Sequence, residues 1–176
     1  MNTISIRTRT RRASRAFTLV EVTLALGVAG FCLVTVFGLL PVGISSNQAS
    51  LEQTMAGNIS SAIVSDLRST QPMGAGTSAR FGLPIPAAGA AATMHTIYLA
   101  SGGSATAVDT APMTSGSAIS RYRATVQFFP PQPAVPRTAT VVRVLITWPA
   151  LADPDYQTLP ANFSGSYEAD TTLDRN

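Results

Sequence analysis

The chain has 176 residues, a formal net charge of +3 and a mean hydropathy of +0.23. All twelve basic residues are arginines, set against nine acidic residues. Five of the arginines fall within residues 1–15, and the rest of the chain holds seven basic and nine acidic side chains, a formal charge of −2. The basicity is therefore local. Because no basic surface with interleaved aromatics remains to follow a phosphate backbone, we expect no nucleic-acid partner.

Cysteine and histidine are too scarce for most catalytic or metal chemistry. Cys32 is the only cysteine, which excludes an intrachain disulfide, and we expect it to be a small buried residue of a helix. His95 is the only histidine, and we expect a structural residue at the head of a strand. No G-x-S-x-G sequence singles out a serine nucleophile. We therefore expect neither an enzyme nor a cofactor.

An arginine-rich segment leads into a long apolar run. Residues 22–40 carry no charge, and nineteen residues at about 1.5 Å each cross most of a hydrocarbon core roughly 30 Å thick. The excess of positive charge before this run favours a cytoplasmic N-terminus and a C-terminal part on the other side of the membrane. We therefore expect a single-pass membrane protein. The five leading arginines are Arg7, Arg9, Arg11, Arg12 and Arg15.

Glu21 is an acidic residue at the head of this apolar run. A carboxylate in hydrocarbon costs on the order of 2.5–3.5 kcal/mol and is usually kept for function. One interpretation places Glu21 at the headgroup boundary, within reach of water. The other requires a cation, and no Lys or Arg occurs between Arg15 and Arg68. A chain that begins at Phe17 would offer its own α-amino group or that of a neighbouring subunit.

The arginine-rich leader, a small residue, the sequence Phe-Thr-Leu-Val-Glu (17–21) and an apolar helix together resemble the prepilin signal of type IV pilins and of type II secretion pseudopilins. The resemblance implies that prepilin peptidase cleaves between Ala16 and Phe17 and that the new Phe17 amine is N-methylated. It also implies that Glu21 pairs with the N-terminal amine of an adjacent subunit during fibre assembly. The family usually has Gly before the cut, so Ala16 departs from its pattern.

Two further resemblances refine this assignment. The Phe-Thr-Leu-Val-Glu-Val start (17–22) and Gly-Leu-Leu (38–40) resemble minor pilins and minor pseudopilins of the V or I type. The sequence Val-Leu-Ile-Thr-Trp-Pro-Ala (144–150) resembles a pilin-like family from Verrucomicrobia gene cassettes. The implied partners are prepilin peptidase, other subunits and inner-membrane lipid. The implied location is the bacterial inner membrane, with the C-terminal domain in the periplasm, and then a pilus or pseudopilus.

Other targeting signals fit the N-terminus less well. A secretory signal peptide has a shorter apolar region followed by a small-x-small cleavage site, whereas this run is long and carries Glu21. The pair Arg11-Arg12 lacks the apolar residues expected after a twin-arginine signal. The serious alternative is an unprocessed single-pass anchor that displays a binding domain and never polymerises.

The rest of the chain predicts an α+β domain. We expect Pro41 to kink or loosen the helix. We expect an amphipathic half over 47–69 to pack on a sheet of its own domain. Its apolar stripe consists of Leu51, Met55, Ile59, Ala62 or Ile63, and Leu67. Polar residues such as Asp66 fall elsewhere around that helix. Residues 72–92 read as a loop. Strands are expected at 94–100, 119–129 and 139–148, the last two as an antiparallel hairpin, with a short edge strand at 163–167 and a loose tail from Asp170.

The predicted organisation is therefore a leader (1–16), a transmembrane and assembly helix (17–46), an amphipathic helix half (47–69) and a globular β-rich domain (70–176). The pattern of a long N-terminal helix packed on a small antiparallel sheet is also the fold that the pilin resemblance implies. Asp153 and Asp155 supply two carboxylates in a late loop, a weak calcium hypothesis, since calcium prefers about six to eight oxygen ligands.

Overall fold

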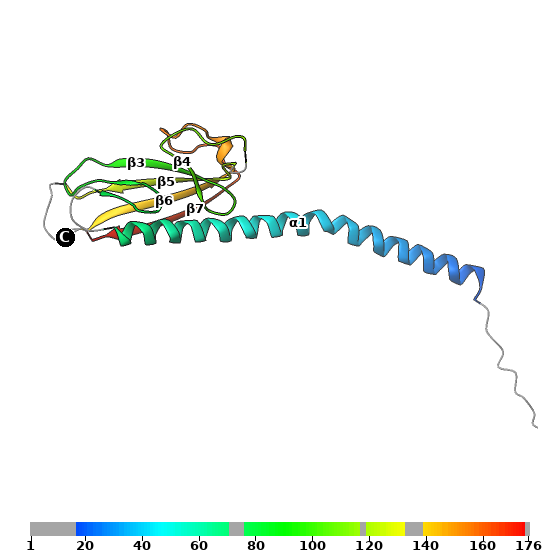
Figure 1. The fold of residues 1–176 in the computed structure, drawn as a ribbon. Helices are drawn as coiled ribbons and strands as arrows, with labels where there is room; N and C mark the ends of the chain where they lie inside the picture. The colour runs from blue at the N-terminus through cyan, green and yellow to red at the C-terminus, as the bar shows by residue number, and fades with distance from the viewer. Residues whose placement is uncertain (1–16, 71–75, 117–118, 133–138, 175–176) are drawn as a thin grey trace, which may run out of the picture. The chain divides into compact units, whose positions relative to one another are not determined.

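The computed structural model describes residues 17–70, 76–116, 119–132 and 139–174 (Figure 1). The chain divides into two compact units, Met1–Ser46 and Asn47–Asn176. Helix α1 (Leu19–Ser69) forms the described part of the first unit and continues into the second. The second unit adds a five-stranded antiparallel sheet and a small two-stranded one, so the fold is α+β as predicted.

Helix α1 passes through Pro41 as one helix of 51 residues. The helix does not end at this proline, and the kink or loosening expected there stays a prediction. Proline removes one N–H donor and disturbs one earlier carbonyl, and the hydrogen bonds of the turns on either side still hold the backbone. By length and composition, α1 is long and apolar enough to cross a membrane.

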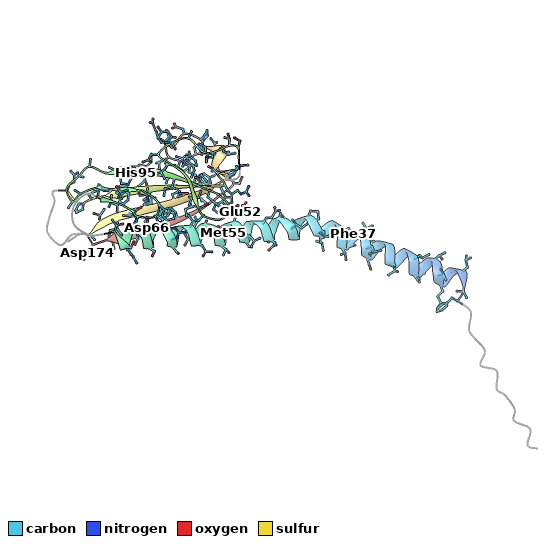
Figure 2. All side chains as sticks on the ribbon, viewed as in Figure 1. Phe37, Glu52, Met55, Asp66, His95 and Asp174 are labelled. Carbon is cyan, nitrogen blue, oxygen red and sulfur yellow. The ribbon has the colours of Figure 1, made fainter. Side chains whose placement is uncertain are left out.

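The second half of α1 packs on the sheet of its own domain, as the amphipathic pattern predicted. Ile59, Ile63 and Leu67 are buried in the core that the helix shares with the strands. The predicted stripe was wrong at its start, because Leu51 is 58% exposed. It was also wrong to leave Asp66 off the buried side, since only 7% of this residue is exposed (Figure 2).

Asp66 is buried because its carboxylate binds backbone of the next segment. Its two oxygens accept hydrogen bonds from the N–H groups of Arg80 and Phe81, at 3.0 and 3.1 Å. The hydroxyls of Ser69 and Thr70 donate to its carbonyl at the end of the helix. Asp66 thus ties the helix end to the chain that follows.

The large sheet has the order β4-β3-β5-β6-β7, with every neighbouring pair antiparallel. The predicted hairpin at 119–129 and 139–148 is confirmed by the pairing of β5 with β6, in which Ala124 lies opposite Ile146. The apolar residues that alternate along β6, Val142, Val144 and Ile146, are fully buried. The strands are β3 (Thr93–Leu99), β4 (Ala105–Val108), β5 (Tyr122–Phe129), β6 (Thr140–Trp148) and β7 (Gly165–Leu173).

Three parts of the domain differ from the sequence prediction. Residues 72–92 are not only loop, because β1 (Gly76–Thr77) and β2 (Pro84–Ile85) form the small sheet and Phe81, Leu83 and Ile85 enter the core. Strand β4 was not predicted. The tail from Asp170 is not loose, since β7 continues to Leu173 and pairs with β6 along its length.

The face of the sheet away from α1 is covered in part by residues 149–164, which we call the strap. It begins with a short 3-10 helix, η1 (Ala150–Ala152). Thr96 and Tyr98 of β3 donate side-chain hydrogen bonds to the strap carbonyls of Tyr156 and Asp153, at 2.9 and 3.2 Å. The strap explains why polar residues on this face of β3 and β5 are buried.

Candidate functional site

The predicted processing and assembly residues lie at the start of α1. Ala16 falls outside the described residues. Phe17 comes just before the helix and is 79% exposed. Glu21 lies in the first helical turn, where a carboxylate is favoured by the positive end of the helix dipole. Phe17 and Glu21 are therefore one turn apart at the same helix end.

Thr18 caps this helix. Its hydroxyl oxygen accepts a hydrogen bond from the backbone N–H of Glu21 at 3.3 Å, and its carbonyl accepts the N–H groups of Glu21 and Val22. A Thr cap followed three residues later by Glu is the sequence of a capping box. Glu21 stands out in the sequence as a charge in an apolar run, whereas the Thr18 cap was not predicted, although its spacing from Glu21 is visible in the sequence. These contacts use the backbone N–H of Glu21 and do not involve its carboxylate.

The part of α1 that lies in the first unit is apolar on every side. Large apolar side chains are exposed at consecutive positions, such as Leu33 with Val34 and Leu39 with Leu40, so no single stripe contains them. Phe37 is 64% exposed in the same run (Figure 2). Cys32, expected to be buried, is also exposed in the isolated chain. A helix that is apolar all round requires hydrocarbon or other helices around it.

The carboxylates of Asp153 and Asp155, the residues of the weak calcium hypothesis, have separate hydrogen-bond partners. Asp153 accepts the backbone N–H groups of Ala161 and Asn162 at 2.8 and 2.6 Å, and the side-chain amide of Asn162 at 3.2 Å. Asp155 accepts the N–H of Gln157. Within the described residues, no three His, Cys, Asp or Glu side chains gather as a metal site would require.

The hydrogen bonds of Asp153 also shift its acidity. Desolvation acts to raise the pKa of Asp153, but the N–H groups of Asn162 and Ala161 outweigh it and hold that pKa below the ordinary value. The carboxylate is charged at neutral pH and closes the strap on itself. Its role in the structure is to shape this loop.

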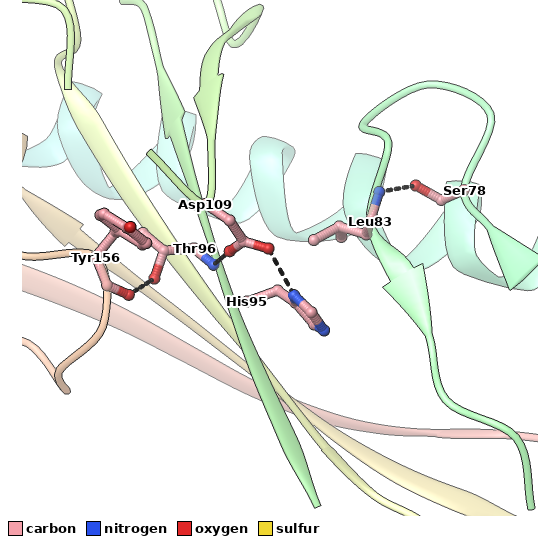
Figure 3. Close-up of polar contacts among 6 residues, drawn as sticks. All are labelled: Ser78, Leu83, His95, Thr96, Asp109 and Tyr156. Atoms are coloured by element: carbon pink, nitrogen blue, oxygen red, sulfur yellow. Dashed lines mark hydrogen bonds and ion pairs between the residues drawn. The ribbon is translucent and has the colours of Figure 1, made fainter. Parts of the chain in front are cut away.

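His95 pairs with Asp109 across the edge of the sheet (Figure 3). Nδ1 of His95 lies 2.7 Å from one oxygen of Asp109, and the other oxygen accepts the backbone N–H of Thr96 at 2.7 Å. The imidazole ring meets Phe128 edge-on at 6.1 Å. Asp109 thereby fastens the end of β4 to β3, and the pair has the geometry of a structural clamp, the role expected for His95.

Arg123 is the most unusual side chain of the sheet, because it is fully buried. Its guanidinium donates to the strap carbonyls of Asp153, at 3.1 Å, and Thr158. Its Nε is buried without a hydrogen-bond partner. Beside it, burial raises the pKa of Tyr98, so the phenol stays protonated and donates to the same Asp153 carbonyl. Arg123 alternates with the apolar residues of β5, and this pattern of residue types gives no sign that a loop covers its face of the strand.

Comparison with known proteins identifies no relative of this chain. No protein-family model matches it, and no curated protein and no solved structure does either.

Proposed function

We propose that this chain is a structural subunit of a type IV pilus-like or secretion pseudopilus fibre, of the minor pilin or minor pseudopilin kind. In this proposal prepilin peptidase removes residues 1–16, Phe17 becomes the methylated N-terminus, and 17–46 anchors the subunit in the inner membrane before assembly. The globular unit then lies on the periplasmic side. We also propose that the α+β fold is that of the pilins.

One observation carries the proposal: a capped, uncharged apolar helix headed by a single carboxylate directly follows an arginine-rich leader. The helix then continues into a half that packs on an antiparallel sheet. An ordinary membrane anchor needs the apolar length but neither the carboxylate nor an exposed start. The order of these features accounts for Glu21, which would otherwise be an unfavourable residue at this position.

The role proposed for Glu21 follows from electrostatics. Fibre assembly surrounds the helix start with other apolar helices, which lowers the local dielectric and strengthens the attraction between a carboxylate and an ammonium group. Removing one member of such a pair leaves the other charge unpaired in a dry environment, which is strongly unfavourable. Glu21 of one subunit would therefore select the position at which the Phe17 amine of the next subunit stops.

The first experiment is the intact mass and N-terminal residue of the protein purified from membranes of cells that contain prepilin peptidase. We expect a chain that starts at methylated Phe17. A matched Ala16→Gly variant restores the residue usual in the family and should be processed at least as completely. If both chains keep the arginines of 1–15, the protein is an unprocessed membrane anchor that displays its domain.

The assembly role is tested with Glu21→Gln, which keeps the side-chain shape and removes the charge. We expect processing to continue and incorporation into sheared fibres to fall severalfold. Thr23→Ala, two residues away, is the matched control, because its hydroxyl bonds only to a carbonyl of its own helix. Normal incorporation of Glu21→Gln would remove the proposed role.

A further inference from the structure

The exposed apolar side chains of the second unit are unevenly placed. Eight large ones are exposed among its described residues. Two of them, Phe129 and Val141, face each other across β5 and β6 at the end where β5 finishes and β6 begins. The other six belong to segments that contact the start of β5 or the end of β6, at the opposite end of the sheet: Leu51, Met113, Ile119, Leu151, Leu159 and Phe163.

That opposite end is where α1 enters the unit, and we call it the helix-entry end. It holds the start of β5, the end of β6 and the start of β7 (Figure 1). Arg121, just before β5, forms an ion pair with Glu52 of α1. This contact places residues 47–56 of the helix beside that end of the sheet.

Backbone hydrogen bonds bring the apolar segments to this end. Ser120 N–H donates to the carbonyl of Met113 at 3.0 Å, which places Met113 beside Ile119. Ala150 N–H donates to the carbonyl of Arg121 at 2.9 Å, which places Ala150 and the following Leu151 near the start of β5. These segments are far apart in the chain and meet at one end of the domain.

The chain length between the leader and this end fits a bilayer. No charged residue occurs from Val22 to Leu51, a stretch of thirty residues. At about 1.5 Å per residue this stretch is about 45 Å long, close to the roughly 40–45 Å thickness of a bilayer with its headgroups. If Glu21 lies at the inner boundary, Leu51 lies at the outer headgroup boundary and Glu52 at the water beyond it.

We propose that the helix-entry end of the globular unit rests on the outer headgroup region of the bilayer through these six apolar side chains. This inference rests on the proposed membrane placement of 17–46. A lipid interface accepts exposed apolar side chains that would be unfavourable in water. The charged groups at this end are largely paired within the chain, since Arg121 pairs with Glu52 and amides bind the Asp153 carboxylate. Asp155, which also lies on the strap, is acidic, so we expect contact with a zwitterionic lipid surface.

The test uses the full chain in phosphatidylcholine vesicles at low protein-to-lipid ratio, in a Cys32→Ala background that leaves no native thiol. A fluorophore is attached to Leu151→Cys at the helix-entry end or, as the matched control, to Val141→Cys at the other end. The two side chains are similarly exposed, 43% and 44%. Phe37→Cys reports whether the helix is inserted. The vesicles carry a nitroxide quencher near the headgroups or deep in the acyl chains.

We expect the Leu151 label to be quenched severalfold more strongly by the headgroup quencher than the Val141 label, and the Phe37 label to respond to the deep quencher. Equal responses at Leu151 and Val141, with Phe37 quenched, would overturn the inference and leave membrane insertion intact. An unquenched Phe37 label would overturn both the insertion and the inference. If the label at Leu151 is shielded from the headgroup quencher, and this shielding disappears when the protein is diluted, a second copy of the chain covers this end. That result would overturn the lipid contact.

Discussion

Gly165 lies against the indole ring of Trp148, and the contact leaves no room for a side chain. A Cβ on Gly165 would come 2.8 Å from Nε1 of Trp148 and closer still to two ring carbons. Trp148 has little freedom to move, because it is 5% exposed and its ring meets Tyr122 edge-on. The start of β7 thus depends on a residue without a side chain.

Gly165→Ala should therefore lower the free energy of unfolding by about 1–3 kcal/mol, the usual effect of forcing an extra carbon into a packed core. Urea unfolding of the full chain in detergent, followed by the fluorescence of its single tryptophan, measures the change. Gly102→Ala is the control, because a Cβ there meets nothing within 4 Å. Equal midpoints for the two variants would show that Trp148 yields to the added carbon.

The strength of periodic patterns explains which parts of this fold could be predicted. Val142, Val144 and Ile146 alternate along β6, and strands buried on one face leave this signal directly in the sequence. In β7, by contrast, small and charged residues such as Ala169 and Asp170 alternate, and the strand exists because β6 offers it an edge. Phe81 and Leu83 enter the core from a Gly-, Ala- and Pro-rich segment whose local sequence predicts only turns.

The candidate site divides in the same way. Glu21 could be found from sequence because a charge stands out in an apolar run. Burial of Arg123 could not be found, since its hydrogen bonds go to strap carbonyls about thirty residues away, and every residue has a carbonyl. Such contacts depend on tertiary placement and leave no pattern of residue types.

Asp66 shows what a buried carboxylate contributes to this domain. Asp66→Ala removes the acceptor of two backbone N–H groups, those of Arg80 and Phe81. Leaving a buried donor unpaired costs about 1–3 kcal/mol, so we expect the free energy of unfolding to fall by at least this much. Asp66→Asn keeps one acceptor oxygen, so its free energy of unfolding in urea should lie between those of the parent and Asp66→Ala. A loss no larger than that of Ser69→Ala, which removes one hydroxyl at the same helix end, would contradict this account.

Arg123 should hold the strap on the sheet. Arg123→Met keeps most of the side-chain volume and removes the donors to the carbonyls of Asp153 and Thr158. Hydrogen bonds to a charged group contribute about 1.5–3 kcal/mol, so we expect a loss of that order. We also expect faster proteolysis within residues 149–164, read by mass spectrometry of limited digests.

Arg143→Met is the matched control for this variant. Arg143 forms exposed ion pairs with Glu168 and Asp170, which contribute about 0–1 kcal/mol at most surfaces. The control should unfold at nearly the same urea concentration as the parent and leave the strap resistant. Strap cleavage that is unchanged in Arg123→Met would show that the buried guanidinium does not fasten it.

Acid should loosen the strap through Asp153. Folding lowers the pKa of this carboxyl, chiefly through the N–H groups of Asn162 and Ala161 acting against desolvation. A group whose pKa is lowered by folding stabilises the protein fully above its unfolded pKa, about 3.9 for Asp. That contribution is lost as the pH falls through the folded pKa.

Asp153→Asn retains an acceptor oxygen but does not titrate, so its stability relative to the parent should improve as the pH is lowered from 6 towards 3. Urea midpoints of both chains across this range measure the trend. Asn162→Ala keeps both backbone donors but removes the side-chain amide that also lowers this pKa, so it should show the parent's trend with a smaller amplitude. A constant difference between parent and Asp153→Asn at every pH would show that this carboxylate does not link the strap to acid.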